Sequence, residues 1–162
     1  MIIASFDIGI FNFATCVAKN NTLLFLKKYT LQSKDVALTL LYFMDTYKNI
    51  WNTCDTFLIE QQHGCNNEAR RVSNYLEMYL KTCYGSFKTI IKFPSIYKTK
   101  VFSTIKMSKK QRKQFCIIKA RDLLKHFYKS NVFLNIFEME IKKDDLADCI
   151  CQLHAYKIKN NV

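Results

Sequence analysis

Five short apolar runs along the chain have the length and composition of β-strands. Each run is rich in aliphatic, aromatic or β-branched residues, and each stops at a polar residue or at a turn signal. The Asn20-Asn21 pair separates the second run from the third, and this predicts a hairpin. The predicted strands cover residues 2–6, 14–19, 23–29, 56–59 and 88–93.

Four other segments place apolar residues three and four positions apart, which is the spacing of one helix face. Asn66 or Asn67 can cap the second of these helices, and Gly85 can end it. Ser108 opens the third with Gln111 at the spacing of a capping box. The predicted helices cover residues 33–49, 68–83, 108–127 and 143–157, and residues 94–107 are expected to be irregular.

The order of these elements is β-β-β-α-β-α-β-α-α, which predicts an α/β fold with a mixed sheet flanked by helices. No internal repeat interrupts it, and with 3 Gly and 1 Pro a flexible linker is unexpected. The length of 162 residues suits one domain with its own core. We therefore expect residues 1–162 to form a single domain.

The formal net charge of +12 gives information about function rather than about fold. A domain this basic usually binds a polyanion, and nucleic acid is the commonest one. A membrane surface is the weaker alternative, because no basic amphipathic helix is free for it and no apolar run reaches the length of a bilayer span. The charge therefore favours a nucleic-acid-binding protein without a membrane role.

The cysteines indicate free thiols rather than disulfides or a zinc site. Their number is odd, their spacing is irregular, and no C-x-x-C motif occurs. The chain also opens on a predicted strand instead of a signal or transit segment. Both features predict an intracellular, reducing compartment. The seven are Cys16, Cys54, Cys65, Cys83, Cys116, Cys149 and Cys151.

Acidic residues stand at positions that suit chemistry, although the chain has only 13 of them against 25 basic residues. Asp7 ends the first strand and Glu60 ends the fourth. If these strands are parallel neighbours, both carboxylates lie at the sheet edge where open α/β sheets bind ligands. On the last helix, Asp145 and Asp148 are three positions apart and share a face. The four carboxylates are therefore expected to converge.

Converging carboxylates repel one another unless cations lie between them. Their hard oxygen atoms favour Mg²⁺ or Mn²⁺, and two such ions about 4 Å apart suit phosphodiester cleavage. Taken singly, Asp7 can be a turn or cap residue, and Asp144 or Asp145 can simply favour the helix dipole. Glu60 has no such capping role, so the set together predicts a metal site.

Three motifs resemble those of RuvC-like resolvases, especially the poxvirus and fungal mitochondrial branch. The first is Asp7-Ile8-Gly9-Ile10-Phe11-Asn12, the second is Ile59-Glu60-Gln61-Gln62, and the third runs from Lys142 to Asp148. They occur in the family's order and frame nearly the whole chain. The resemblance implies a ribonuclease H-like fold, a homodimer, and Mg²⁺-dependent nicking of four-way DNA junctions.

The resemblance also implies roles for individual residues. Asp7, Glu60, Asp145 and Asp148 match the metal ligands, with Asp144 as an alternative to Asp145. A functional lysine is expected in the basic stretch 109–113, where Lys110 and Lys113 are the candidates and general phosphate binding is the alternative role. The viral branch is favoured over the mitochondrial one, which would place the protein in host cytoplasm.

Three other functions share some of these features. A ribonuclease H-like nuclease acting on other branched DNA or RNA can use the same carboxylates. An actin-like phosphotransferase also begins with Asp-x-Gly, but the chain is too poor in glycine for its phosphate loops. A non-catalytic nucleic-acid binder is disfavoured because carboxylates oppose phosphate. The remaining polar candidates are expected to be structural: His63, His126 and His154.

Overall fold

One mixed sheet forms the centre of the computed structural model, which describes residues 1–62, 64 and 66–162. Within this part of the chain the strand order is β3-β2-β1-β4-β5. β1 pairs antiparallel with β2 and parallel with β4, so the predicted parallel neighbours are confirmed. The strands are β1 Ile2–Asp7, β2 Phe13–Lys19, β3 Thr22–Tyr29, β4 Thr56–Gln61 and β5 Thr89–Pro94.

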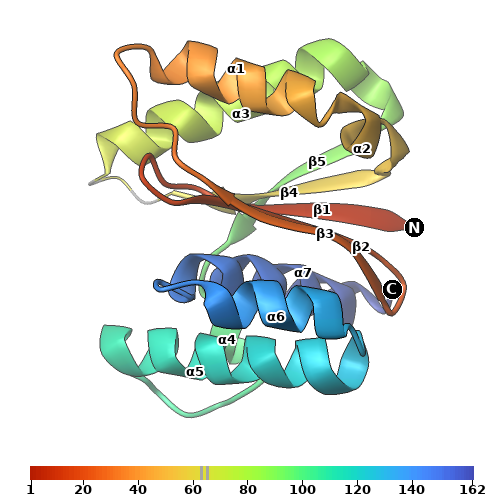
Figure 1. Ribbon diagram of the computed structural model, residues 1–162, viewed down its shortest axis with the longest axis vertical. Helices are drawn as coiled ribbons and strands as arrows, with labels where there is room; N and C mark the ends of the chain where they lie inside the picture. The colour runs from red at the N-terminus through yellow and green to blue at the C-terminus, as the bar shows by residue number, and fades with distance from the viewer. Residues whose placement is uncertain (63, 65) are drawn as a thin grey trace.

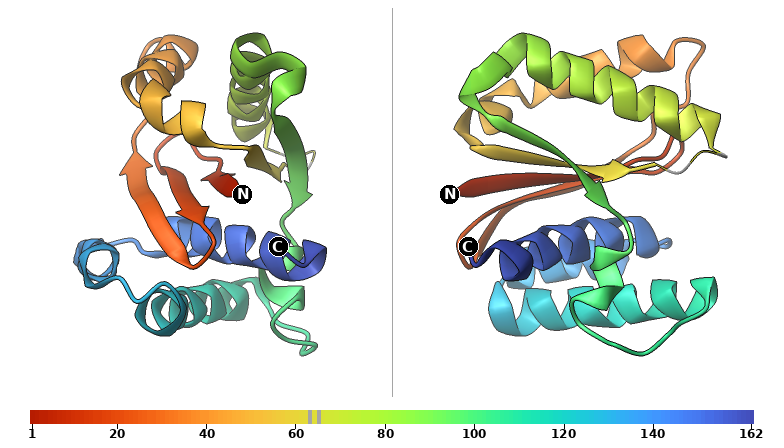
Figure 2. Two further views of the ribbon diagram at one scale, coloured as in Figure 1. Left: turned by 90° about the vertical axis from the view of Figure 1, so that its right-hand side faces the viewer. Right: turned by 180° about the vertical axis from the view of Figure 1, so that it is seen from behind.

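Helices cover both faces of this sheet. α1, α2 and α3 lie on one face, whereas α7 lies along the other with α5 beyond it (Figures 1 and 2). The α-helices are α1 Val36–Thr46, α2 Lys48–Thr53, α3 Asn67–Tyr84, α4 Tyr97–Lys100, α5 Lys109–Asp122, α6 Asn131–Met139 and α7 Asp144–Asn160. The 3-10 turn Gly85–Phe87 follows α3, and the π-turn Leu123–Phe127 extends α5.

The side chains of the central strand β1 alternate between the two faces of the sheet, and this explains why the core has two layers. Ala4 and Phe6 of β1 pack in the cluster shared with α1–α3, whereas Ile3 packs in the cluster shared with α5 and α7. Because successive side chains of a strand point to opposite faces, Ser5 and Asp7 lie on the face of Ile3. The sheet is thus buried on both sides, and its polar β1 side chains face α7.

Three segments differ from the expectation drawn from the sequence. The helix predicted over 33–49 breaks at Tyr47, after which α2 turns so that Trp51 is buried and its Nε1 donates to Met44 O at 2.9 Å. The region 94–107 contains the short helix α4, which is too short to show a periodic pattern. α6 was not predicted either, and the Ser130 side chain caps it by accepting from Phe133 N.

The described cysteines are free thiols, and Cys83 is the exposed one among them. Four of the buried ones belong to the cluster beneath α7: Cys16, Cys116, Cys149 and Cys151. No helix in residues 1–62, 64 and 66–162 has the length and hydropathy to cross a membrane. Cys65 and His63 lie outside the described residues.

Candidate active site

Three carboxylates from distant parts of the sequence meet around one lysine. Asp7 and Glu60 stand at the adjoining ends of β1 and β4, and Asp148 lies in the second turn of α7. Lys98 Nζ is 2.7 Å from Asp7 Oδ1, 2.8 Å from Glu60 Oε1 and 3.1 Å from Asp148 Oδ2. Three of the four predicted metal ligands therefore lie within reach of a single cation.

Lys98 is a site residue that the sequence reasoning missed. In the sequence, Lys98 lies with Tyr97 and Phe102 in a segment of basic and aromatic residues, a pattern compatible both with stacking on bases and with ordinary packing. The structure instead buries it to 3 % exposure on α4. Its position follows from the sheet topology, because β5 is parallel to β4 and the segment after β5 reaches the same sheet edge.

Burial and mutual charge determine the ionisation of this cluster. Burial raises the pKa of Asp7 well above its usual value, and the charges of Glu60 and Asp148 add to this while Lys98 opposes it. Burial also disfavours charge on Glu60, but Lys98 and hydrogen bonds from Asp7 and Gln62 bring its pKa below the usual value. The pKa of Lys98 is raised despite burial, because three carboxylates surround it. The cluster therefore requires a cation at its centre.

The other two acids of the third motif lie apart from this centre. Asp145 pairs with Lys142 at 3.1 Å and lines a separate hollow of about 270 Å³ beside Gly9 and Asn12. Asp144 accepts from Lys113 Nζ at 2.5 Å, which lowers its pKa despite partial burial. With Lys98 between the carboxylates, the described His, Cys, Asp and Glu side chains contain no group of three arranged around a metal position.

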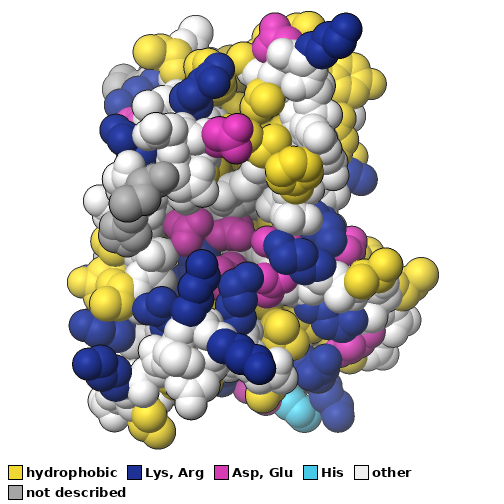
Figure 3. All heavy atoms as spheres, turned by 90° about the vertical axis from the view of Figure 1, so that its left-hand side faces the viewer, with side chains coloured by type: hydrophobic (Ala, Val, Ile, Leu, Met, Phe, Trp, Pro, Cys, Tyr) yellow, Lys and Arg dark blue, Asp and Glu magenta, His cyan; other side chains and the backbone are white. Residues whose placement is uncertain are grey.

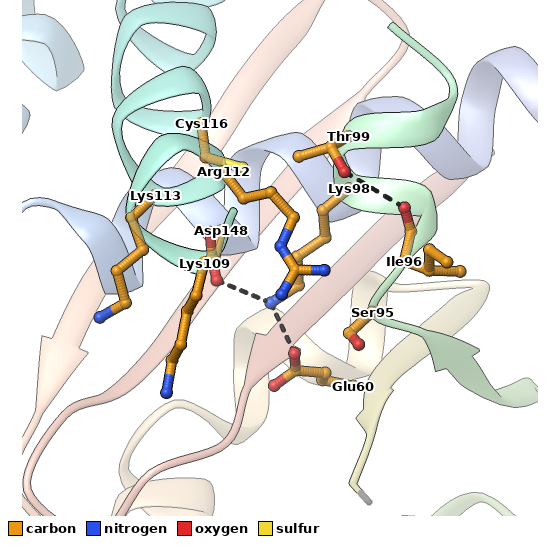
Figure 4. A pocket seen from close by; sticks show the side chains of 10 residues that line it. All are labelled: Glu60, Ser95, Ile96, Lys98, Thr99, Lys109, Arg112, Lys113, Cys116 and Asp148. Carbon is orange, nitrogen blue, oxygen red and sulfur yellow. Dashed lines mark hydrogen bonds and ion pairs between the residues drawn. The ribbon is translucent and has the colours of Figure 1, made fainter. Parts of the chain in front are cut away.

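A hollow of about 440 Å³ opens over the cluster, and α5 forms one wall of it. Glu60, Lys98 and Asp148 line its inner part, and Lys109, Arg112 and Lys113 line it from the first turns of α5, with the ammonium end of Lys113 on the side away from Glu60 (Figure 4). Lys110, the other predicted functional lysine, is exposed and is not part of this lining. The hollow therefore combines an acidic floor with a basic wall.

The same charge pattern is visible on the surface. In the face onto which β1 and β4 end, carboxylates gather in the middle, and many Lys and Arg side chains lie next to them, mostly below and to the right in this view (Figure 3). A phosphodiester strand suits such a face, because the basic rim can hold phosphates on either side of the one that meets the carboxylates.

The described histidines lie away from this hollow. His154 packs against the rings of Phe102 and Phe127 at centroid distances of 6.0 and 4.5 Å. Burial, helped by nearby lysines, lowers its pKa to about 4, so the ring is neutral at pH 7. This packing agrees with the structural role expected for His154.

Comparison with known sequences identifies viral relatives. No family model matches the chain. Protein 170L of Invertebrate iridescent virus 6 is 39% identical over 151 residues, which is 80% of this chain and 58% of that protein. Protein 97L of Invertebrate iridescent virus 3 is 35% identical over 124 residues, which is 76% of this chain and 58% of that protein. The chain thus spans less than two thirds of both relatives, which are described as uncharacterized.

Comparison with solved structures identifies the fold. The Fowlpox virus resolvase, solved with Holliday junction DNA, has a TM-score of 0.75 at 18% identity and covers 100% of this chain and 99% of its own. RuvC of Thermus thermophilus has a TM-score of 0.69 at 11% identity, and the match covers 99% of this chain and 96% of RuvC. The yeast mitochondrial Holliday junction resolvase Ydc2 has a TM-score of 0.61 at 16% identity, and the match covers 96% of this chain and 78% of Ydc2. The chain therefore has the ribonuclease H-like fold of the RuvC-like Holliday junction resolvases, as its motifs predicted.

Proposed function

We propose that this protein is a metal-dependent DNA endonuclease that resolves four-way junctions by paired nicks in opposed strands. The observation that carries the proposal is the convergence of Asp7, Glu60 and Asp148 beneath a basic wall. The likeness of the fold to junction resolvases supports the choice of substrate. The viral relatives and the free thiols support a site of action in host cytoplasm.

The carboxylate set fits divalent cations. Its oxygen atoms are the hard ligands that Mg²⁺ and Mn²⁺ prefer, and Asp7 is ionised readily only when a cation lies beside it. We propose Asp7, Glu60 and Asp148 as ligands of two ions. Asp145, with Asp144 as its alternative, lies apart from these three and would have to turn toward them to serve as the fourth ligand. Bound ions would lower the pKa of a water molecule and offset charge on the phosphodiester.

The basic residues around the cluster have distinct roles in this proposal. Lys98 holds the three carboxylates together, which keeps their spacing fixed before substrate arrives. Lys109, Arg112 and Lys113 hold the phosphates of the bound strand at the mouth of the hollow. Lys113 also pairs with Asp144, so its ammonium stays next to the motif that carries Asp148. Lys113 is therefore our choice of catalytic lysine over Lys110.

A substrate panel tests the proposed function. Labelled four-way junction, duplex, flap and RNA–DNA hybrid are each incubated with the protein in Mg²⁺ or in EDTA, and nicks are mapped on every strand. We expect symmetric nicks in opposed strands of the junction, with little cutting of the other substrates and none in EDTA. Preferential cutting of the hybrid or the flap would instead support a ribonuclease H-like nuclease of another specificity.

The two candidate lysines are expected to differ in a kinetic comparison. Lys113→Ala should lower turnover about a hundredfold with a smaller loss of affinity, because an ammonium at the reacting phosphate offsets charge in the transition state. Lys110→Ala should weaken binding and reduce the salt dependence by about one charge. Single-turnover rates and junction affinity at several salt concentrations measure both effects. Equal losses in the two variants would contradict a specific role for Lys113.

A homodimer would supply the two active sites that paired nicking needs. One apolar stripe of α3 is buried within the chain: Ala69, Val72, Leu76 and Leu80. The Tyr79 hydroxyl donates to Asp45 of α1 at 2.7 Å, so this side chain is engaged within the chain. Tyr75 and Met78 stay exposed at 37% and 67%. We propose that they contact a second copy.

Charge placed on this face should separate the copies. The double variant Tyr75→Glu with Met78→Glu is expected to sediment as a folded monomer at micromolar concentration, because the interface would have to bury two unpaired carboxylates. It should nick junctions singly instead of in pairs. Met139→Glu, at an exposed apolar position on α6, is the matched control and should behave like the wild type. A wild type that stays monomeric on a junction would refute the dimer.

A further inference from the structure

A glutamine lies fully buried in the middle of α7, one turn beyond Asp148. Gln152 has 0% exposure and is surrounded by the apolar cluster beneath the sheet, next to Leu153. A side-chain amide placed in such a core must find hydrogen-bond partners or it destabilises the fold. The residues that satisfy it therefore indicate what it does.

The partners of Gln152 belong to the two strands that carry Asp7 and Glu60. Its Nε2 donates to Ser5 Oγ at 3.0 Å and to the Phe6 carbonyl at 3.2 Å, both on β1. A longer contact of 3.4 Å reaches the Leu58 carbonyl on β4. One turn earlier, Cys149 Sγ donates to the Ser5 carbonyl at 2.8 Å. One amide thus joins α7 to both strands directly before their acids.

This contact lies at the point where the two strands part. The β1–β4 pairing ends at the partners Phe6 and Ile59, so Asp7 has a partner on β2 but none on β4. Beyond this point the strand ladder no longer fixes the distance between Asp7 and Glu60. The Gln152 amide bonds to both strands at this position, and its helix carries Asp148 four residues earlier.

Stability alone does not account for an amide at this position. Gln152 Oε1 has no hydrogen-bond partner among residues 1–62, 64 and 66–162, so the core holds a buried acceptor that an apolar side chain would avoid. Buried polar groups that break the rule of full hydrogen bonding are typical of functional sites. We propose that Gln152 is a positioning residue, which sets Asp148 relative to Asp7 and Glu60 and so determines how tightly the three carboxylates hold a divalent cation.

The test compares Gln152→Met with Leu153→Ala, and it rests on the proposed function. Methionine keeps the length of the side chain but cannot donate, whereas Leu153→Ala leaves a cavity at the next position and keeps the amide. Mn²⁺ binding is measured by thermal shift without DNA. Turnover and KM for a four-way junction are measured in saturating Mn²⁺, at a temperature where both variants are folded.

We expect Gln152→Met to raise the half-saturating Mn²⁺ concentration about tenfold and to lower turnover by a similar factor, with KM within twofold of the wild type. Leu153→Ala should lose thermal stability but keep the half-saturating Mn²⁺ concentration and the turnover of the wild type. Should Gln152→Met fail to fold, Gln152→Asn, which is one methylene too short to reach both strands, takes its place with the same expectation.

Two results would overturn the proposal. One is unchanged Mn²⁺ binding and turnover in the Gln152 variant. The other is an equal loss in Leu153→Ala, which would make the effect one of general stability. A wild type that binds Mn²⁺ but cuts no DNA would contradict the nuclease function, and the Mn²⁺ comparison would still decide the role of Gln152.

Discussion

Asp7→Asn is expected to slow junction cleavage about a thousandfold while junction binding stays nearly unchanged. The substitution removes one charge from the centre of the carboxylate cluster and keeps the size of the side chain. Metal-ion catalysis contributes several kcal/mol of charge stabilisation, and a loss of about 4 kcal/mol corresponds to about a thousandfold in rate. Single-turnover cleavage in saturating Mg²⁺ measures the rate, and mobility shift in Ca²⁺ measures binding.

The comparison of acids sharpens this test. Glu60→Gln and Asp148→Asn should resemble Asp7→Asn, since all three carboxylates contact the same ammonium. Asp122→Asn, which removes an exposed acid paired with Lys119 on α5, is the control and should cut normally. Asp145→Asn and Asp144→Asn decide which of these two neighbours is the fourth ligand. Turnover near the wild-type value for Asp7→Asn would refute the metal-site assignment.

Lys98→Met is expected to lower the free energy of unfolding by about 3–5 kcal/mol in EDTA. Removing one partner of a buried ion pair leaves uncompensated charge in the interior, and here three carboxylates lose their shared cation. Urea denaturation in EDTA measures the change. Mg²⁺ should restore part of the lost stability, because ions bound to the folded state stabilise it.

The pH dependence gives this prediction a definite sign. Without Lys98, the carboxylates of the folded state have pKa values above those of the unfolded chain, so the folded state binds more protons and gains stability as pH falls. In the wild type, Lys98 brings the pKa of Glu60 below its usual value and opposes the rise in the pKa of Asp7, so the wild type gains less stability than the variant as pH falls. The difference between the two proteins should therefore shrink from pH 7 toward pH 4.

Lys157→Met is the matched control for Lys98→Met. Lys157 is also buried on the α7 side of the sheet, but its ammonium donates to the Asn20 carbonyl and burial lowers its pKa. Its replacement leaves no carboxylate unpaired, so we expect a smaller loss of stability and no recovery with Mg²⁺. A loss for Lys98→Met no larger than that for Lys157→Met would contradict the role of Lys98 as the shared cation.

The sheet and two of its acids followed from local pattern alone. Short apolar runs ending in Asp7 and Glu60 predict two strand ends, and the carboxyl-edge rule for parallel strands predicts their meeting. Asp148 followed from its motif and from its position on the last helix. These features depend on spacing within one element or on the order of elements, both of which the sequence records directly.

Lys98 and Asp145 could not be placed in this way. Whether a lysine is buried depends on which groups several elements bring together, and α4 has only four residues to signal its presence. Asp145 shares a helix face with Asp148, yet it pairs with Lys142 and lines a neighbouring hollow. Helix periodicity gives the direction of a side chain only to within a turn, and a metal site needs finer placement.

The contacts between β1 and α7 also bear on how the protein is made. Cys149 and Ser5 are 144 positions apart, and Gln152 and Ser5 are 147 positions apart. Strand β1 can therefore make these contacts only after α7 has been synthesised. Contacts of such long sequence separation form late, because closing the intervening loop costs conformational entropy. A ribosome-bound chain that lacks α7 has Asp7 and Glu60 but not Asp148. The carboxylate cluster can therefore form only after synthesis has passed α7.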